Sequence, residues 1–214
     1  MDLVVLAGGE SRRMKNGGPA AVSNKAFLKI DGKNLIEIVI ERLRPLFDTV
    51  IISSASGGSC QDIDAVEIAD IYPESGSLGG IYSGLSAASS DSIFVIACDM
   101  PFVNPKLVKM LVSRSAGHDI VIPRITSGET DSGNPKLMKL EPLHAVYSKA
   151  CLPHIEPLLK QGNLKIFDFF HMVNVNYVGV DEIRIIDPKM LSFFNINTPE
   201  DFAQAYALAD GACR

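Results

Sequence analysis

The chain lacks the features that mark membrane, secreted and zinc-binding proteins. Its four cysteines form no CxxC pair, which fits reduced thiols better than a disulfide framework or a zinc site. No apolar run approaches the roughly 20 residues of a membrane-spanning helix, and no signal-type segment precedes the first apolar run. We therefore expect a cytoplasmic protein that does not act at a membrane.

The chain also lacks an excess of positive charge. Its 20 lysine and arginine residues are outnumbered by 25 aspartate and glutamate residues, and they form no basic run. The net charge of −5 argues against nucleic acid as a partner. The four histidines have no metal-ligand spacing. Neither standard phosphate-binding fingerprint, G-x-G-x-x-G or G-x-x-x-x-G-K-[ST], occurs, so any phosphate must be bound by a different kind of loop.

What the chain does have is a regular alternation of strand and helix patterns. Short apolar runs predict strands at Leu3–Leu6, Thr49–Ser53, Val66–Ala69, Ile93–Ala97 and Asp119–Pro123, and the first of them has the length and branched residues of a buried parallel strand. Helical patterns separate them, so we expect an α/β, Rossmann-like fold with a mostly parallel, doubly wound sheet and helices on both faces. With 214 residues, 47% of them hydrophobic, and no repeat or long linker, residues 1–214 are expected to form a single domain.

Local signals place several element boundaries. Asn34 with Glu37 three residues later resembles a capping box, and Asn104 followed by Pro105 reads as a helix N-cap and first residue. The polar segment 124–142 is expected to be a long functional loop. For the C-terminal part we expect a strand returning to the sheet at 142–148, a helix at 149–161, an antiparallel strand at 173–186, and a strand, capped turn and helix from 193 onward.

The loop after the first strand is suited to binding phosphate. Gly8 and Gly9 allow a tight turn and a close approach of the backbone to a ligand, while Ser11, Arg12 and Arg13 offer a hydroxyl and two permanent cations. Backbone N–H groups aimed into a concavity bind phosphate oxygens, and arginine adds charge-assisted hydrogen bonds. The alternative reading is an ordinary strand-to-loop junction with solvated arginines.

Polar side chains also follow later strands. In an open α/β sheet, ligands bind outside the carboxyl ends of the strands, so we expect Asp70, Asp99, Asn195 and Asn197 to converge on the crevice that Gly8 and Gly9 line. Asp99 directly follows an apolar run, where a half-buried carboxylate is costly unless a cation or hydrogen bonds stabilise it. A magnesium ion fits this donor type. The alternative is an aspartate that merely caps the following turn.

With these residues in view, the chain resembles the molybdenum cofactor guanylyltransferases, which are MobA-like nucleotidyltransferases of the nucleotide-diphospho-sugar transferase fold type. The resemblance rests on the order and spacing of LAGGESRRM (6–14), AFLKIDGK (26–33), VEIAD (66–70), SGSLGGIYSGL (75–85), CDMPF (98–102), EPLHAVY (141–147) and FFNINTPEDF (193–202).

The resemblance implies roles for individual residues. It implies that the catalytic residues are Arg13, Lys25 and Asp99, and that Mg²⁺ is held by Asp99 and Asn197, with Asn195 the weaker candidate. The implied nucleotide-binding residues are Leu6, Ala7, Gly8, Gly9, Lys25, Asp70, Gly79 and Asp99. In EPLHAVY, Glu141, His144 and Tyr147 either face the acceptor or pack a strand, and the resemblance favours an acceptor-side position in the cleft for His144 and Tyr147.

The resemblance also implies a reaction. A phosphate oxygen of molybdopterin attacks the α-phosphorus of GTP, giving the guanine dinucleotide cofactor and pyrophosphate. Because a phosphate oxygen is already a nucleophile, the absence of a Ser, Cys or His nucleophile is consistent with this chemistry. Other proteins of molybdenum cofactor assembly are expected partners. Two alternatives stay open: a sibling enzyme that uses CTP or another phosphate acceptor, and a noncatalytic nucleotide-binding module of cofactor assembly.

Three departures from the family pattern affect this interpretation. The segment between Met14 and Lys25 is longer than usual; Lys25 precedes AFLKIDGK as the family lysine does, and Lys15 is the competing candidate. The family's asparagine after the second strand is missing from ISSAS (52–56), which removes a nucleobase contact and weakens the choice of guanine. Ser77 stands where a proline is common.

Overall fold

The computed structural model describes residues 1–7, 25–55, 57, 60, 63–126 and 139–212. Within these residues, seven strands form one sheet in the order β5-β4-β1-β6-β8-β7-β9. Their bounds are β1 Asp2–Leu6, β4 Val50–Ser54, β5 Val66–Ala69, β6 Ser92–Ala97, β7 Ile120–Pro123, β8 His144–Ser148 and β9 Val175–Val178. The short hairpin strands β2 (Lys29–Ile30) and β3 (Lys33–Asn34) pair separately.

The central strands are parallel, as the sequence predicts. β1 pairs with β4 on one side and β6 on the other, and β4 pairs with β5, all in parallel. β8 runs antiparallel to both β6 and β7. In the described residues, therefore, the carboxyl ends of β1, β4, β5 and β6 meet at one edge of the sheet, and the chain enters β8 from that same edge.

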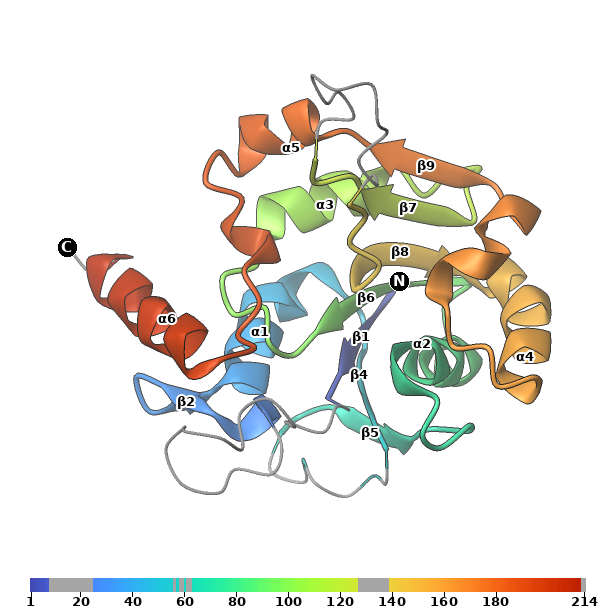
Figure 1. Cartoon of the computed structure of the whole chain (residues 1–214), viewed down its shortest axis with the longest axis horizontal. Coiled ribbons are helices and arrows are strands. Elements are labelled where there is room, and N and C mark those ends of the chain that lie inside the picture. Colours follow the sequence, from blue (N-terminus) through green and yellow to red (C-terminus); the bar gives the residue numbers. More distant parts are fainter. Residues whose placement is uncertain (8–24, 56, 58–59, 61–62, 127–138, 213–214) are drawn as a thin grey trace.

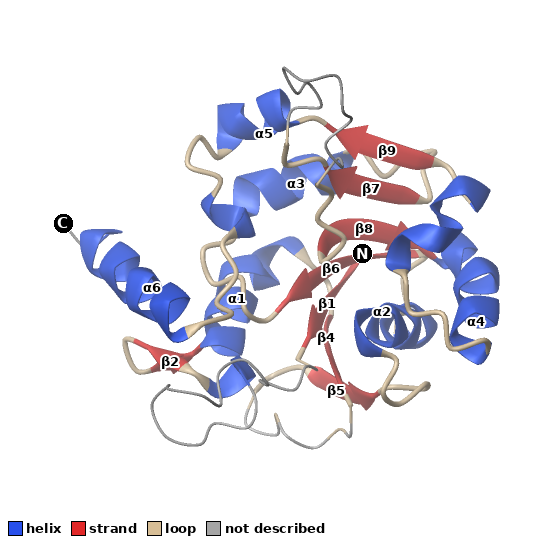
Figure 2. Ribbon diagram, in the orientation of Figure 1, coloured by secondary structure: helices blue, strands red, loops and turns tan. Residues whose placement is uncertain are grey.

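Helices cover both faces of the sheet (Figures 1 and 2). α1 and α3 lie on one face, where they pack on the core cluster that contains Phe94 and Val146. α2 and α4 contact each other on the opposite face, over the cluster that contains Tyr147 and Phe169. The helix bounds are α1 Leu35–Leu43, α2 Gly76–Ala87, α3 Pro105–Ser113, α4 Leu152–Lys160, α5 Val180–Ile186 and α6 Pro199–Ala212.

The helix boundaries follow the local sequence signals. At the start of α1, Glu37 accepts a hydrogen bond from the backbone N–H of Asn34 at 2.8 Å, as expected for a capping box. At the start of α3, the side chain of Asn104 accepts from the N–H of Lys106 at 3.0 Å, and Pro105 is the first helical residue. Pro153 lies in the first turn of α4, and Pro157 lies inside that helix.

The prediction of an antiparallel strand over 173–186 is wrong. β9 is shorter and runs parallel to β7, and α5 begins two residues after it. Gly179 ends the extended segment, and Glu182 accepts its N–H at 3.4 Å as α5 begins. Val180 and Ile183 are buried three residues apart. Buried residues three positions apart are typical of one face of a helix. The alternating apolar residues of the same segment are typical of a strand, and for this reason the sequence pattern leads to the wrong prediction.

The strand predicted at the start of FFNINTPEDF is also absent. Residues 191–193 form a short 3₁₀ helix, η5, and the next four residues join no sheet. The backbone of Ile196 instead donates one hydrogen bond to the carbonyl oxygen of Asp99 at 3.0 Å. This extended segment therefore lies beside the carboxyl end of β6, and the predicted capped helix, α6, follows it.

Candidate functional site

Three polar side chains from distant parts of the sequence meet at the carboxyl end of β6. Lys25 begins the 3₁₀ helix η1 (Lys25–Phe27), Asp99 follows β6, and Asn197 precedes α6. The ammonium of Lys25 donates to Asn197 Oδ1 at 2.6 Å and lies 3.6 Å from Asp99 Oδ2. The side chains of Lys25 and Asp99 are each less than one-fifth exposed. The fold thus brings together the lysine and both oxygen donors that the sequence singles out.

A capping turn holds Asn197 in this position. The carboxylate of Asp201 accepts the backbone N–H groups of Asn197 and Thr198, each at 2.8 Å. Thr198 Oγ1 in turn accepts the N–H of Asp201 at 3.1 Å. Together with the bond from Ile196 to Asp99, these contacts fix the backbone on both sides of Asn197. The helix cap of α6 is therefore also the support of a site residue.

The charged form of Asp99 is unfavourable in its surroundings unless a positive charge lies near it. Burial raises the pKa of Asp99 above its ordinary value, and the nearby Lys25 charge limits that rise. Asp99 Oδ1 is buried and has no hydrogen-bond partner among the described residues. A carboxylate oxygen without a partner, next to an amide oxygen, is a donor set that suits a hard divalent cation such as Mg²⁺. The residues present therefore fit the ion that the sequence predicts.

A second group of predicted residues lies on the side of β1 away from β6. Leu6 pairs in register with Ser53 of β4, and the backbone N–H of Ala7 donates to the Ser53 carbonyl at 2.9 Å. The hydroxyl of Ser53 donates to Asp70 Oδ1 at 2.5 Å. Burial raises the pKa of Asp70, and this hydrogen bond works in the opposite direction. Asp70 is thus held at the same edge of the sheet as Leu6 and Ala7.

The glycine pair of α2 allows close packing at this edge. A Cβ on Gly79 would lie 2.8 Å from Ser75 Cβ and 3.0 Å from the carbonyl oxygen of Tyr72. A Cβ on Gly80 would lie 2.9 Å from Leu6 Cδ2. The first turn of α2 is therefore seated directly against the end of β1. The nucleotide contact predicted for Gly79 stays a prediction, alongside this packing role.

Some predicted residues lie outside the described part of the chain. Gly8, Gly9, Arg13 and the alternative lysine Lys15 all fall within 8–24, so the phosphate-binding loop stays a prediction from sequence. The last described residue before this range is Ala7, which follows Leu6, whose carbonyl accepts the N–H of Cys98 at 3.2 Å. The first described residue after it is Lys25.

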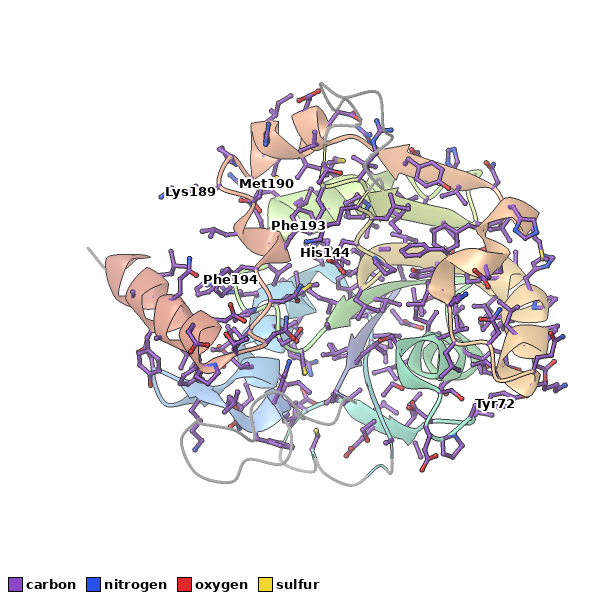
Figure 3. All side chains as sticks on the ribbon, viewed as in Figure 1. Tyr72, His144, Lys189, Met190, Phe193 and Phe194 are labelled. Atoms are coloured by element: carbon purple, nitrogen blue, oxygen red, sulfur yellow. The ribbon has the colours of Figure 1, made fainter. Side chains whose placement is uncertain are left out.

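The expectation that His144 and Tyr147 line the cleft is wrong, because both side chains are fully buried. The His144 ring contacts the rings of Phe94 and Phe193, with centroid separations of 5.3 and 5.0 Å; Figure 3 labels His144 and Phe193. The Tyr147 hydroxyl donates to the carbonyl of Pro142 at 2.9 Å. Both residues are part of β8, whose two faces are covered, so the packing interpretation of this motif holds for them.

Two site residues are less evident from sequence. Asp201 has a local signal, because Thr198 and Asp201 have the spacing of a capping box. Glu141 begins the turn that leads into β8: His144, the first residue of β8, is opposite Ile96 of β6, and the N–H of Ala97 donates to the Leu143 carbonyl. Glu141 is close enough to Asp99 for the two carboxyl groups to interact. Burial raises the pKa of Glu141, and the Asp99 charge adds to the rise.

A mostly parallel sheet with a charged cluster at its carboxyl edge is typical of α/β nucleotide-binding enzymes. Residues 3–174 match the model of the MobA-like NTP transferase domain family. The chain is 34% identical over 209 residues to a probable molybdenum cofactor guanylyltransferase of Pelotomaculum thermopropionicum, covering 98% of this chain and 93% of the relative. It is 38% identical over 209 residues to another of that name from Methanosarcina mazei, covering 92% and 86%.

Solved structures include a similar protein with a related name and a more distant protein with the same fold. The crystal structure of molybdopterin-guanine dinucleotide biosynthesis protein A from Archaeoglobus fulgidus superposes with a TM-score of 0.78 at 30% identity, covering 99% of this chain and all of that one. A cytidylyltransferase from Thermus thermophilus shares the fold, with a TM-score of 0.64 at 19% identity over 97% and 98% of the two chains. The chain belongs to the MobA-like nucleotidyltransferase family, and it is a nucleotidyltransferase. No helix in the described residues is long and apolar enough to cross a membrane.

Proposed function

We propose that this protein transfers GMP from GTP to molybdopterin in a magnesium-dependent reaction, forming the guanine dinucleotide cofactor and pyrophosphate. The observation that carries the proposal is the meeting of Lys25, Asp99 and Asn197 at the carboxyl end of β6. The proposed substrates rest on the names of its relatives, which are described as probable molybdenum cofactor guanylyltransferases.

The proposed chemistry needs positioning and charge stabilisation. An oxygen of the acceptor phosphate forms a bond to the α-phosphorus of GTP, and the bond from that phosphorus to the bridging oxygen of the β-phosphate breaks, releasing pyrophosphate. Asp99 and Asn197 would hold Mg²⁺, which when bound neutralises charge on the phosphate oxygens. Lys25 and Arg13 add positive charge beside the leaving pyrophosphate. No side chain acts as a nucleophile.

The two sides of Asp99 have different proposed roles. Leu6, Ala7, Asp70 and the start of α2 lie toward β4 and β5 and would hold the nucleotide. The acceptor would then approach from the side of β8, where Glu141 lies near Asp99. In this proposal the reacting phosphates of both substrates would lie next to Lys25 and Asp99, as an in-line transfer requires.

The test is a competition experiment. The protein is incubated with Mg²⁺, molybdopterin and equal concentrations of GTP and CTP, and the products are identified by mass. The expected result is mainly the guanine dinucleotide together with pyrophosphate, with some cytosine dinucleotide, because ISSAS lacks the asparagine and fewer buried polar groups then discriminate between the bases. Exclusive formation of the cytosine dinucleotide would reassign the enzyme to the CTP-using sibling. Nucleotide binding without pyrophosphate release would indicate a noncatalytic module.

A further inference from the structure

The ammonium of Lys25 contacts both side chains that are proposed to hold the metal. It donates to Asn197 Oδ1 at 2.6 Å and pairs with Asp99 Oδ2 at 3.6 Å. Lysine carries a compact point charge on a flexible four-carbon stem, so it can occupy one charged position and then swing to another. In this arrangement the lysine supplies positive charge to the same oxygen donors that a divalent cation would use.

Among the described residues, carboxyl groups outnumber ammonium groups around the contact of Lys25 with Asp99 and Asn197. Burial opposes the charged form of Asp201, but the N–H groups of Asn197 and Thr198 and the Lys25 charge together lower the pKa of Asp201. On the other side of Asp99, the carboxyl of Glu141 is close enough for the two charges to interact. Lys25 is thus an ammonium that interacts with the carboxyl groups of Asp99 and Asp201, and Asp99 has a third carboxyl group, that of Glu141, near it. Like charges that lie close together disfavour one another's charged forms, and a neighbouring cation favours them.

We propose that Lys25 is the resident counter-ion of the Asp99–Asn197 pair, and that it exchanges these partners for the nucleotide phosphates when a divalent cation binds. The inference rests on the metal site of the proposed function and assigns Lys25 a second role beside phosphate binding. In the absence of nucleotide, Lys25 compensates the buried Asp99 carboxylate and competes with the divalent cation for it.

This exchange of partners by Lys25 couples the binding of the divalent cation to the binding of the nucleotide. Nucleotide phosphates give the ammonium another partner, so the Asp99 and Asn197 oxygens become available to the cation. By thermodynamic linkage, the cation must then favour nucleotide binding by the same factor. The competition ensures that the cation is bound firmly in the presence of nucleotide and weakly without it.

The test is titration of nucleotide-free protein with Mn²⁺, followed by electron paramagnetic resonance of the free ion. The proteins compared are the wild type, Lys25→Met, and Lys29→Met as the matched control, since Lys29 is an exposed lysine of β2. A neighbouring cation typically changes the proton affinity of a carboxylate by about 1–3 pKa units, so Lys25→Met is expected to bind Mn²⁺ at least about tenfold more tightly than the wild type. Lys29→Met is expected to match the wild type.

Further variants locate the effect. Adding Asp99→Asn to Lys25→Met is expected to abolish the gain in Mn²⁺ affinity. Lys25→Gln can still donate a hydrogen bond to Asn197 without the charge, so it is expected to show the gain too, and it serves if Lys25→Met does not fold. Unchanged or weaker Mn²⁺ binding in the folded Lys25 variants, or no binding in any of the proteins, would overturn the proposal.

The outcome is separable from that of the proposed function. If the wild type fails to make the guanine dinucleotide while Lys25→Met still binds Mn²⁺ more tightly, the substrate assignment fails and the counter-ion role stands. If the wild type makes the product and Lys25→Met shows no gain in affinity, the counter-ion role alone fails.

Discussion

Asp99 and His144 are largely buried polar groups associated with the neighbouring strands β6 and β8. The surroundings of Asp99 provide a charge partner, whereas the surroundings of His144 favour its neutral form. Asp99, just beyond the end of β6, is paired with an ammonium and kept available at the edge of the sheet. His144, on β8, contacts two phenylalanine rings, and neither of its ring nitrogens has a hydrogen-bond partner among the described residues. Burial lowers the pKa of His144 to about 3, although the Asp187 carboxylate acts in the opposite direction.

The difference shows that a titratable residue in a sequence motif indicates a functional site when the fold keeps it charged and places an opposite charge beside it. The neutral imidazole avoids the cost of burying a charge. The Asp99 carboxylate keeps a charge partner beside it, at an edge of the sheet where ligands bind. Four substitutions test this contrast, and their expected effects decrease in the order given.

Asp99→Asn is expected to have the largest effect on activity. It turns a compensated charge into a neutral buried polar group of the same size, so turnover should fall by at least about 10²–10³-fold while the fold is retained. Pyrophosphate release and a thermal melt measure the two effects. Asp64→Asn, which removes a carboxylate that is 96% exposed, is the control and should leave both unchanged. Normal turnover by Asp99→Asn would remove this residue from the proposed metal site.

Lys25→Ala removes the compensating charge. The loss of one charge-assisted contact in the transition state is expected to cost about 2–4 kcal/mol, which is about 1.5 to 3 orders of magnitude in kcat/KM. Lys15→Ala should cost less, because Lys25 is the lysine that contacts Asn197 and Asp99. Steady-state kinetics of the two variants decide the matter. A larger loss with Lys15→Ala would make Lys15 the phosphate-binding lysine.

Asp70→Asn tests the role of a carboxyl group that accepts a hydrogen bond from the hydroxyl of Ser53. If Asp70 contacts the nucleotide, losing a hydrogen bond to a charged group should raise the KM for GTP by about tenfold, with a smaller change in kcat. Glu74→Gln changes an exposed residue of the following loop and serves as the comparison. An unchanged KM would limit Asp70 to its structural hydrogen bond with Ser53.

His144→Leu is expected to have the smallest effect on activity and a clear effect on the pH dependence of stability. Between the ordinary pKa of 6.5 and the folded value of about 3, the unfolded chain binds a proton that the folded chain does not. The free energy of unfolding of the wild type should therefore fall, as the pH drops below 6.5, by up to about 1.4 kcal/mol per pH unit from this group.

Urea unfolding at pH 7 and pH 5 measures this difference. The loss of stability on acidification should be smaller for His144→Leu than for the wild type, while kcat/KM at pH 7 stays within a few-fold. His171→Leu, at an exposed position, should behave as the wild type does. A large loss of activity with unchanged KM for GTP would return His144 to an acceptor-side role.

The sequence predicts the parts of this fold that depend on short-range patterns. The five strands and the capped starts of α1 and α3 follow from apolar runs and capping residues. The position of Asp99 at the carboxyl edge of the sheet follows from the geometry of parallel strands, whereas Lys25 is predicted from the family resemblance. What it misses depends on register and on long-range pairing. The burial of His144 needs Phe193, which is contributed by a segment about 50 residues later in the chain. The proximity of Glu141 to Asp99 needs the antiparallel pairing of β8 with β6.

The most direct test is a crystal structure of the protein with Mn²⁺ and a non-hydrolysable GTP analogue, with the ion located by its anomalous scattering. We expect the ion to be bound by Asp99, Asn197 and phosphate oxygens, with the Lys25 ammonium moved from Asn197 onto the phosphates. An ion held by the phosphates alone, with Lys25 still paired to Asp99 and Asn197, would contradict the account.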